Sequence, residues 1–282
     1  MSFGHTRRSF LPVLAGLALS PDVLAQPRAP WRPGLQLYTV RDALDTDLDG
    51  TLRRVADIGY REVELAGLTG VTPHAMRASL RRYALAAPSM HAGYDELRRD
   101  LSAVLEEARI LGAGYLVCPS VDAAERRTAG DWKRVCRTLN GIGRAVRGRG
   151  LMLAYHNHDF EFVPFDDGTT PFRMLMTETD PGDVKLELDV YWVAKAGLDP
   201  VRHLVNGHDR IVLVHLKDLG ADGATVEVGR GVLDMEKIVL AALAAGAQHL
   251  FVEQDNSVDP LASIGSSFGF LERLPADVRR PR

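Results

Sequence analysis

Histidines and acidic residues recur at the ends of four apolar segments in the second half of the chain. These segments end in YHNHDFE, ELDVYW, VHLKD and FVEQD, and their candidate metal ligands are His156, Asp189, His215 and Glu253. A charged side chain among apolar neighbours needs a partner or a metal ion. Imidazole nitrogens together with carboxylate oxygens suit a divalent transition metal. The four residues together predict one divalent metal ion, Mn²⁺ or Zn²⁺ first and Co²⁺ or Mg²⁺ as alternatives, although each alone has an ordinary structural explanation.

The elements that must position these residues follow a regular alternation. Eight apolar segments rich in β-branched residues alternate with amphipathic helical patterns such as Leu44, Leu48, Leu52 and Val55. The predicted strands cover 35–40, 62–66, 86–91, 115–119, 151–158, 184–190, 211–217 and 249–254. Eight strand–helix units in about 245 residues predict an α/β fold, a single closed (β/α)8 TIM barrel.

A doubly wound open sheet is the alternative fold. Such a sheet usually carries a glycine-rich phosphate-binding turn after its first strand, whereas the sequence there reads YTVRD. In a closed barrel, catalytic side chains gather at the carboxyl ends of the strands. Since the four candidate ligands end the fifth to eighth predicted strands, the barrel would bring them to one face.

The first 25 residues form a separate segment. Residues 7–11 read RRSFL, which is similar to the twin-arginine export signal of bacteria. The apolar run 10–19 would rise only about 15 Å as a helix, too little to cross about 30 Å of hydrocarbon. The sequence VLA at 23–25 is typical of a signal cleavage site. We therefore predict a signal peptide at 1–25, a barrel domain at 26–282 and a periplasmic protein; the alternative is a frayed helix with a chance arginine pair.

Composition excludes several classes of protein. Hydrophobic and charged fractions of 46% and 25% exclude a disordered or fibrous chain. A formal net charge of −3 argues against a nucleic-acid binder. After signal cleavage, no apolar run is long enough to span a membrane. Cys118 and Cys136 could pair in an oxidising compartment, but their apolar surroundings favour two free buried thiols.

The sequence resembles the xylose isomerase-like TIM barrel family over residues 33–274. The resemblance is carried by LxLDVYW with Asp189, VHLKD with His215, the GRG sequence at 229–231, and FVE with Glu253. The segment YHNHDFEF is most similar to proteins of the sugar phosphate isomerase/epimerase group. The resemblance implies a sugar-modifying enzyme with one divalent metal ion and a small-molecule sugar substrate.

The resemblance also implies a set of ligands. The family binds its metal through residues of strands five to eight, which by position gives Asp189, His215 and Glu253. The strand-five ligand of the epimerases is a glutamate, and it falls on His156 here. The family's inosose dehydratases have a similar histidine-containing strand. His158 faces the same way as His156, because side chains alternate along a strand, and is the competing candidate. We favour His156.

By the same resemblance, the chemistry takes place beside a sugar carbonyl. An isomerase or epimerase would remove the neighbouring proton and stabilise the enediolate through the metal. Glu253 keeps one acid–base position of the epimerases and His156 occupies the other. Two carboxylates and two neutral histidines leave a divalent ion with no net charge, which favours polarising a leaving group. A lyase or dehydratase acting on a keto sugar, keto-glycoside or inosose is therefore the alternative function.

Further residues are candidates for contacts with the substrate. These are His91, His158, Glu161, Lys217, Arg230 and Trp192. Lys217 and Arg230 could contact an oxyanion or phosphate, whereas Trp192 and Tyr38 could stack on a sugar or belong to the core. Glu161 could instead form a surface salt bridge. Glu64 could reach the pocket or pair with an arginine in the barrel floor.

Two rival classes remain. The nuclease branch of the family has a histidine three residues after the strand-six aspartate, where this chain has Trp192, so we expect no nucleic-acid partner. A periplasmic sugar-binding protein would not need a metal site. Export favours free sugars over phosphorylated ones as substrates. The sequence leaves the oligomeric state open.

Overall fold

The computed structural model describes Met1 and residues 31–68 and 70–279. The signal-peptide prediction for residues 1–25 falls, Met1 apart, outside the described residues. Eight parallel strands close into a barrel in the order β1-β10-β7-β6-β5-β4-β3-β2, which confirms the predicted TIM barrel. The strands are β1 (Gly34–Gln36), β2 (Glu62–Leu65), β3 (Ala86–His91), β4 (Tyr115–Cys118), β5 (Met152–His156), β6 (Val184–Asp189), β7 (Ile211–Leu216) and β10 (His249–Val252).

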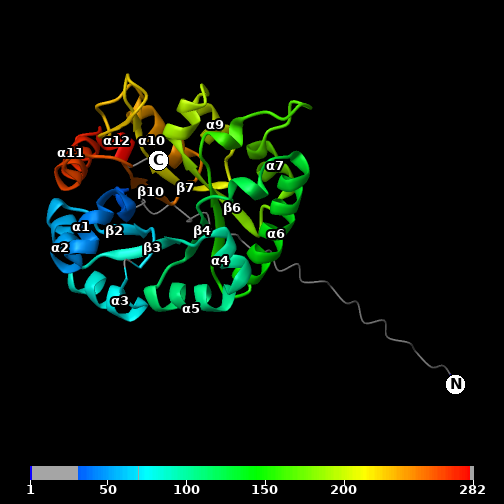
Figure 1. Ribbon diagram of the computed structural model, residues 1–282, viewed down its shortest axis with the longest axis horizontal. Helices are drawn as coiled ribbons and strands as arrows, with labels where there is room; N and C mark the ends of the chain where they lie inside the picture. Colours follow the sequence, from blue (N-terminus) through cyan, green and yellow to red (C-terminus); the bar gives the residue numbers. More distant parts are fainter. Residues whose placement is uncertain (2–30, 69, 280–282) are drawn as a thin grey trace.

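Helices surround the barrel, and the last helices lie beside the first ones, which completes the ring (Figure 1). The α-helices are α1 (Arg41–Thr46), α2 (Leu48–Ile58), α3 (Pro73–Arg82), α4 (Tyr94–Arg99), α5 (Leu101–Leu111), α6 (Ala129–Arg147), α7 (Pro171–Glu178), α8 (Val190–Lys195), α9 (Pro200–Asn206), α10 (Met235–Ala244), α11 (Pro260–Glu272) and α12 (Ala276–Arg279). The short elements are the 3-10 helices η1 (Leu37–Val40), η2 (Ala123–Glu125) and η3 (Phe160–Phe162), and the hairpin of β8 (Asp218–Leu219) and β9 (Thr225–Val226).

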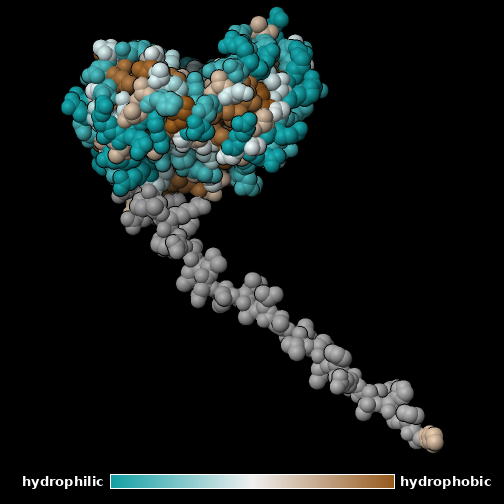
Figure 2. All heavy atoms as spheres, turned by 90° about the horizontal axis from the view of Figure 1, so that it is seen from below, coloured by the Kyte–Doolittle hydropathy of each residue, from teal (hydrophilic) through white to brown (hydrophobic). Residues whose placement is uncertain are grey.

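The amphipathic helices place their apolar stripes on the barrel. Leu52 and Val55 of α2 are fully buried, and so is Leu139 of α6. Hydrophilic side chains cover most of the face seen in Figure 2, with hydrophobic groups exposed in patches between them. Cys118 and Cys136 are both free and buried, which agrees with two unpaired thiols. No helix within the described residues is long and apolar enough to cross a membrane.

Several strands end earlier than predicted, which moves site residues into loops. Of the predicted segment 35–40 only residues 35 and 36 belong to β1, because the side chain of Gln36 accepts the N–H of Tyr38 and the chain turns into η1. The strand β5 ends at His156 and β10 ends at Val252. His158 and Glu253 therefore lie on the rim at the carboxyl ends of the strands, not within the strands themselves.

The predicted first helix is divided by a capping residue. The Leu44–Val55 pattern continues through both α1 and α2, but the side chain of Asp47 accepts the N–H of Gly50 and starts a second helix. Aspartate is a favoured N-cap because its carboxylate satisfies an otherwise free N–H group. The short turn leaves the apolar stripe intact, so it changes the helix boundaries and not the packing.

Candidate metal centre

The four predicted ligands converge at the carboxyl end of the barrel. His156 ends β5, Asp189 ends β6, His215 lies in β7 and Glu253 follows β10, and all four side chains are buried. Nδ1 of His215 lies 2.8 Å from Oε2 of Glu253, and Nε2 of His156 lies 3.8 Å from Oδ2 of Asp189. The strand register produces this convergence, because Asp189 is paired with His215.

Two further buried carboxylates, Glu187 and Glu64, contact the imidazole rings of His156 and His215 and form a lower layer of the site. Nδ1 of His156 lies 3.1 Å from Oε2 of Glu187, its register partner across β5 and β6. Nε2 of His215 lies 2.7 Å from Oε2 of Glu64 on β2. Each imidazole thus has one nitrogen against a buried carboxylate and the other directed at the candidate ligands. This is the arrangement that fixes the ring orientation of metal-binding histidines.

His91 joins the two carboxylates of this lower layer. Its Nε2 lies 3.2 Å from Glu64 and 3.1 Å from Glu187. Glu64 also accepts hydrogen bonds from Gln36 and Ser89. Glu64 therefore lies in the barrel interior, and its partners there are histidines and polar groups, with no arginine among the described residues bonded to it.

Lys217 lies among three carboxylates at the upper layer. Its Nζ is 3.1 Å from Asp189, 2.9 Å from Glu253 and 2.9 Å from Asp255, and only 2% of its side chain is exposed. The predicted oxyanion or phosphate contact would have to compete with these three ion pairs. Carboxylates therefore outnumber the ammonium around Lys217, which favours binding of a cation at this layer.

The hydrogen bonding of Asp189 is a second observation that agrees with a metal site. Oδ1 of Asp189 accepts the N–H groups of Tyr191 and Trp192 and so caps α8. Oδ2 of Asp189 is buried and accepts no hydrogen bond of good geometry from the described residues, although Lys217 lies nearby. Ligand atoms of Asp189, His215 and Glu253 lie within 4.8 Å of one another. This buried carboxylate oxygen lies beside the Lys217 ammonium, an imidazole and a second carboxylate, and such a set of oxygen and nitrogen donors suits a divalent cation once the ammonium yields its place.

Burial and ion pairing shift the pKa values of Asp189, Glu253 and His158 in different directions. Burial raises the pKa of Asp189 to about 6, although Lys217 acts in the opposite direction. Burial also opposes ionisation of Glu253, but Lys217 and His215 outweigh it and hold the pKa of this carboxyl below its usual range. Burial, assisted by the Lys217 charge, lowers the pKa of His158 to about 4. His158 is therefore neutral at pH 7.

A pocket of about 480 Å³ connects the cluster with solvent. Its walls include the predicted residues His91, His156, His158, Trp192, Lys217 and Glu253, together with Tyr38. Nδ1 of His158 and Nε1 of Trp192 are buried there without a hydrogen-bond partner among the described residues. The side chains of His158 and Trp192 line the pocket, so a ligand bound there would lie against these two rings.

Two other predicted residues lie outside the pocket wall. Glu161 is fully buried, and its carboxylate accepts the hydroxyl of Tyr155 at 2.6 Å and the backbone N–H of His158 at 2.7 Å. It fixes the loop that carries His158 and does not form a surface salt bridge. Arg230 is exposed, with its Nε 3.3 Å from Ser266 Oγ.

Glu187 and Asp255 were not singled out from the sequence. Glu187 precedes Asp189 by two residues, so strand alternation places both on the same face, and this signal was available. Asp255 lies beyond β10 in a loop, where alternation gives no direction. Only the fold brings Asp255 to Lys217.

A closed eight-stranded barrel with a buried cluster of histidines and carboxylates at its carboxyl face defines the class of protein as a TIM barrel with a candidate metal centre. The chain belongs to the xylose isomerase-like TIM barrel family, whose family model matches residues 52–274.

Individual relatives have several activities. An inosose dehydratase from Geobacillus kaustophilus is 28% identical over 219 residues, which cover 69% of each chain. An inosose dehydratase from Geobacillus thermodenitrificans is 29% identical over 51% of this chain and 55% of its own length. A sugar phosphate isomerase/epimerase structure from Parabacteroides distasonis is 25% identical with a TM-score of 0.77, covering 87% of this chain and 99% of that one. The structure of the IolI protein with a bound zinc atom, 13% identical, shares the fold with a TM-score of 0.71 over 89% of this chain and all of its own.

Proposed function

We propose that this chain is a metal-dependent enzyme that removes a proton next to the carbonyl of a keto sugar or related polyol. The observation that carries the proposal is the paired arrangement of His156 and His215, each held by a buried carboxylate and directed at Asp189 and Glu253. His156, Asp189, His215 and Glu253 would hold one divalent ion. When bound, the ion supplies Lewis-acid polarisation of the substrate oxygens.

Glu253 is the proposed base. It lines the pocket and its low pKa keeps it ionised at neutral pH. His158 is the proposed second proton-transfer group, because it lines the same pocket and its lowered pKa leaves the imidazole neutral at pH 7. Glu161 orients it by accepting the His158 backbone N–H. If the proton returns to carbon, the product is an isomer or epimer of the substrate.

A lyase or dehydratase is the second candidate. Two observations favour it: the histidine at the strand-five position and the 28% identity to an inosose dehydratase over 69% of the chain. In this reaction Glu253 takes the same proton, and the neighbouring carbon loses a hydroxyl or an alkoxy group. The first step is common to both candidates, so the fate of the carbon skeleton decides between them.

Proton exchange in D₂O tests the proposal. The metal-loaded protein is incubated with a panel of keto sugars and inososes, and products are followed by NMR. Deuterium incorporation with all substituents retained indicates an isomerase or epimerase, whereas loss of water or an alcohol indicates a lyase. We expect Glu253→Gln to abolish exchange. Unchanged exchange in this variant would show that Glu253 is not the base.

Metal analysis of two variants tests the ligand assignment. His156→Gln is expected to lose most of its metal, because it removes a proposed ligand. His158→Gln is expected to keep the metal and lose turnover. The reverse pattern would make His158 the strand-five ligand.

A further inference from the structure

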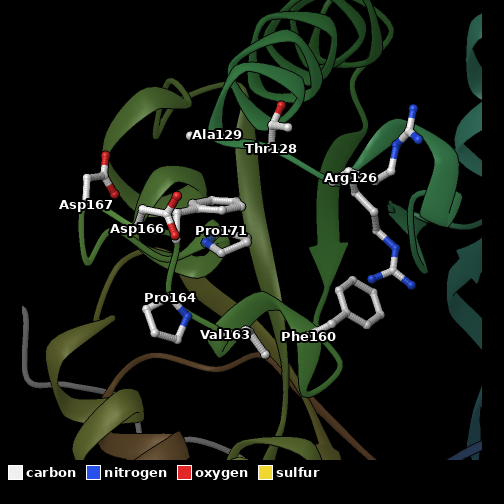
Figure 3. A pocket seen from close by; sticks show the side chains of 11 residues that line it. Arg126, Thr128, Ala129, Phe160, Val163, Pro164, Asp166, Asp167 and Pro171 are labelled. Carbon is white, nitrogen blue, oxygen red and sulfur yellow. The ribbon is translucent and has the colours of Figure 1, made fainter.

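A second hollow of about 620 Å³ opens beside the candidate metal centre, between the segment that leads into α6 and the loop after β5. Figure 3 shows Arg126 lying over Phe160 on one side and Asp166 and Asp167 on the other, with Val163 between these sides. Val163 is 61% exposed. The hollow therefore combines an apolar base with polar groups at opposite edges.

Phe160 separates this hollow from the pocket of the metal centre. Its ring stacks on that of His158, with centroids 5.4 Å apart and planes inclined by 9°. His158 lines the pocket, and its ring lies 5.0 Å from that of His156. The two spaces therefore lie on either side of the stacked rings of Phe160 and His158.

Arg126 and Asp166 are the polar groups that face each other across the hollow, whereas Asp167 accepts the backbone N–H of Thr169 and Thr128 is bonded to Asp131. The guanidinium carbon of Arg126 lies 3.3 Å from the Phe160 ring centroid, and the buried Nε of Arg126 has no hydrogen-bond partner in the described part of the chain. Figure 3 shows the Asp166 carboxylate across the hollow from Arg126, and Asp166 is exposed. Donors on one edge, acceptors on the other and an apolar base suit a ring with hydroxyl groups at its rim and C–H groups on its face.

We propose that this hollow is a second subsite, which binds the second ring of a two-ring substrate while its keto-sugar ring lies at the candidate metal centre. The proposal rests on the proposed function, because that function places the reacting ring. It narrows the substrate class to glycosides or disaccharides of keto sugars, in preference to free monosaccharides.

Binding of matched sugars tests the subsite. The probes are D-fructose and three disaccharides that contain it, lactulose, maltulose and turanose, titrated into the Zn²⁺-loaded full chain by calorimetry. We expect at least one disaccharide to bind about tenfold more tightly than fructose, which corresponds to roughly 1.4 kcal/mol. If none binds more tightly than fructose, the subsite does not exist.

A blocking variant locates the effect. Val163→Trp fills the hollow from an exposed position, so we expect it to fold normally and lose the disaccharide advantage while fructose binding stays unchanged. Val205→Trp is the matched control, because Val205 is 58% exposed on α9 and does not line the hollow. Asp166→Ala should reduce the advantage without adding bulk. An advantage that survives Val163→Trp overturns the proposal.

The same samples separate the two proposals. Metal content and proton exchange in D₂O report on the metal-dependent activity, whereas the ratio of disaccharide to fructose affinity reports on the hollow. Preserved exchange without a disaccharide advantage removes the subsite alone. The opposite result is a wild type that shows no proton exchange but binds a disaccharide more tightly than fructose, with this preference lost in Val163→Trp. It removes the proposed function and supports the subsite.

Discussion

The ammonium of Lys217 lies 2.9 Å from Oε2 of Glu253, the same oxygen that Nδ1 of His215 approaches to 2.8 Å. Lys217 and a metal ion would therefore compete for the same carboxylate, Glu253. Asp189 is shared in the same way, since its Oδ2 lies 3.1 Å from the ammonium. The charge of this buried lysine must influence how tightly a cation binds.

We expect Lys217→Met to bind Mn²⁺ or Zn²⁺ at least tenfold more tightly than the wild type. The ammonium lies 2.9 Å from Glu253 and 3.1 Å from Asp189, so it repels a cation bound to these oxygens. Removing it relieves a repulsion of several kcal/mol at an effective dielectric constant of about 20, although the carboxylates lose part of their order. Titration calorimetry measures the affinity. Lys195→Met is the control, because the Lys195 ammonium contacts the Tyr191 hydroxyl and no candidate ligand. Weaker binding in Lys217→Met would mean that Lys217 positions the carboxylates.

The same substitution should destabilise the metal-free protein. Without the ammonium, the carboxylates of Asp189 and Glu253 lose an ion-pair partner at 3.1 and 2.9 Å, and removing one partner of a buried ion pair typically costs about 3–5 kcal/mol. Chemical denaturation with and without metal measures this. We expect the loss to be largely recovered on metal addition. Equal stability of variant and wild type in the presence of a chelator would contradict this account.

Glu187→Gln is expected to weaken metal binding by about 10–100-fold, the usual effect of removing a carboxylate behind a metal-binding histidine. The amide still fills the space, so the change reports on the orientation and basicity of His156 and of His215, whose Nε2 lies 3.2 Å from the same carboxylate oxygen. Glu62→Gln is a matched control, because Glu62 holds Nδ1 of His249 at 2.7 Å in a similar pair on strands β2 and β10, outside the metal cluster. A metal affinity unchanged in Glu187→Gln would remove His156 from the ligand set.

The sequence was sufficient to predict the barrel and the residues that converge at its mouth, because both depend on periodicity along single strands. Strand alternation and the rule for strand ends placed Asp189, His215 and Glu253 on one face. The lower layer of carboxylates was harder to predict. Glu64 on β2 contacts His215 on β7 only because the sheet closes into a barrel, since these two strands are not neighbours. The partners of Lys217 come from two separate elements, the end of β6 and the segment after β10. Such contacts are set by barrel closure and loop paths, which local sequence patterns do not encode.

Glu161 predicts a pH dependence of stability. Burial raises its pKa to about 7, whereas an unfolded carboxyl titrates near 4.5. Between these values the folded state holds a proton that the unfolded state has released, so stability falls as pH rises from about 4.5 to 7 and then levels off. The shift corresponds to about 3 kcal/mol. We expect Glu161→Gln to remove this component. Urea denaturation of both proteins at pH 5 and pH 7.5 tests it, and parallel pH profiles would show that Glu161 does not carry the shift.

The N-terminal prediction is tested by export and not by folding. If residues 1–25 are a twin-arginine signal, replacing both Arg7 and Arg8 with lysine should retain the protein in the cytoplasm, because the export machinery recognises the arginine pair. The wild type should appear in the periplasmic fraction with Gln26 as its first residue, as mass spectrometry would show. Replacing Arg28 and Arg32 with lysine, beyond the predicted cleavage site, should leave export unchanged. Wild-type protein found only in the cytoplasm with its first residues intact would refute the signal and, with it, the reason for preferring unphosphorylated substrates.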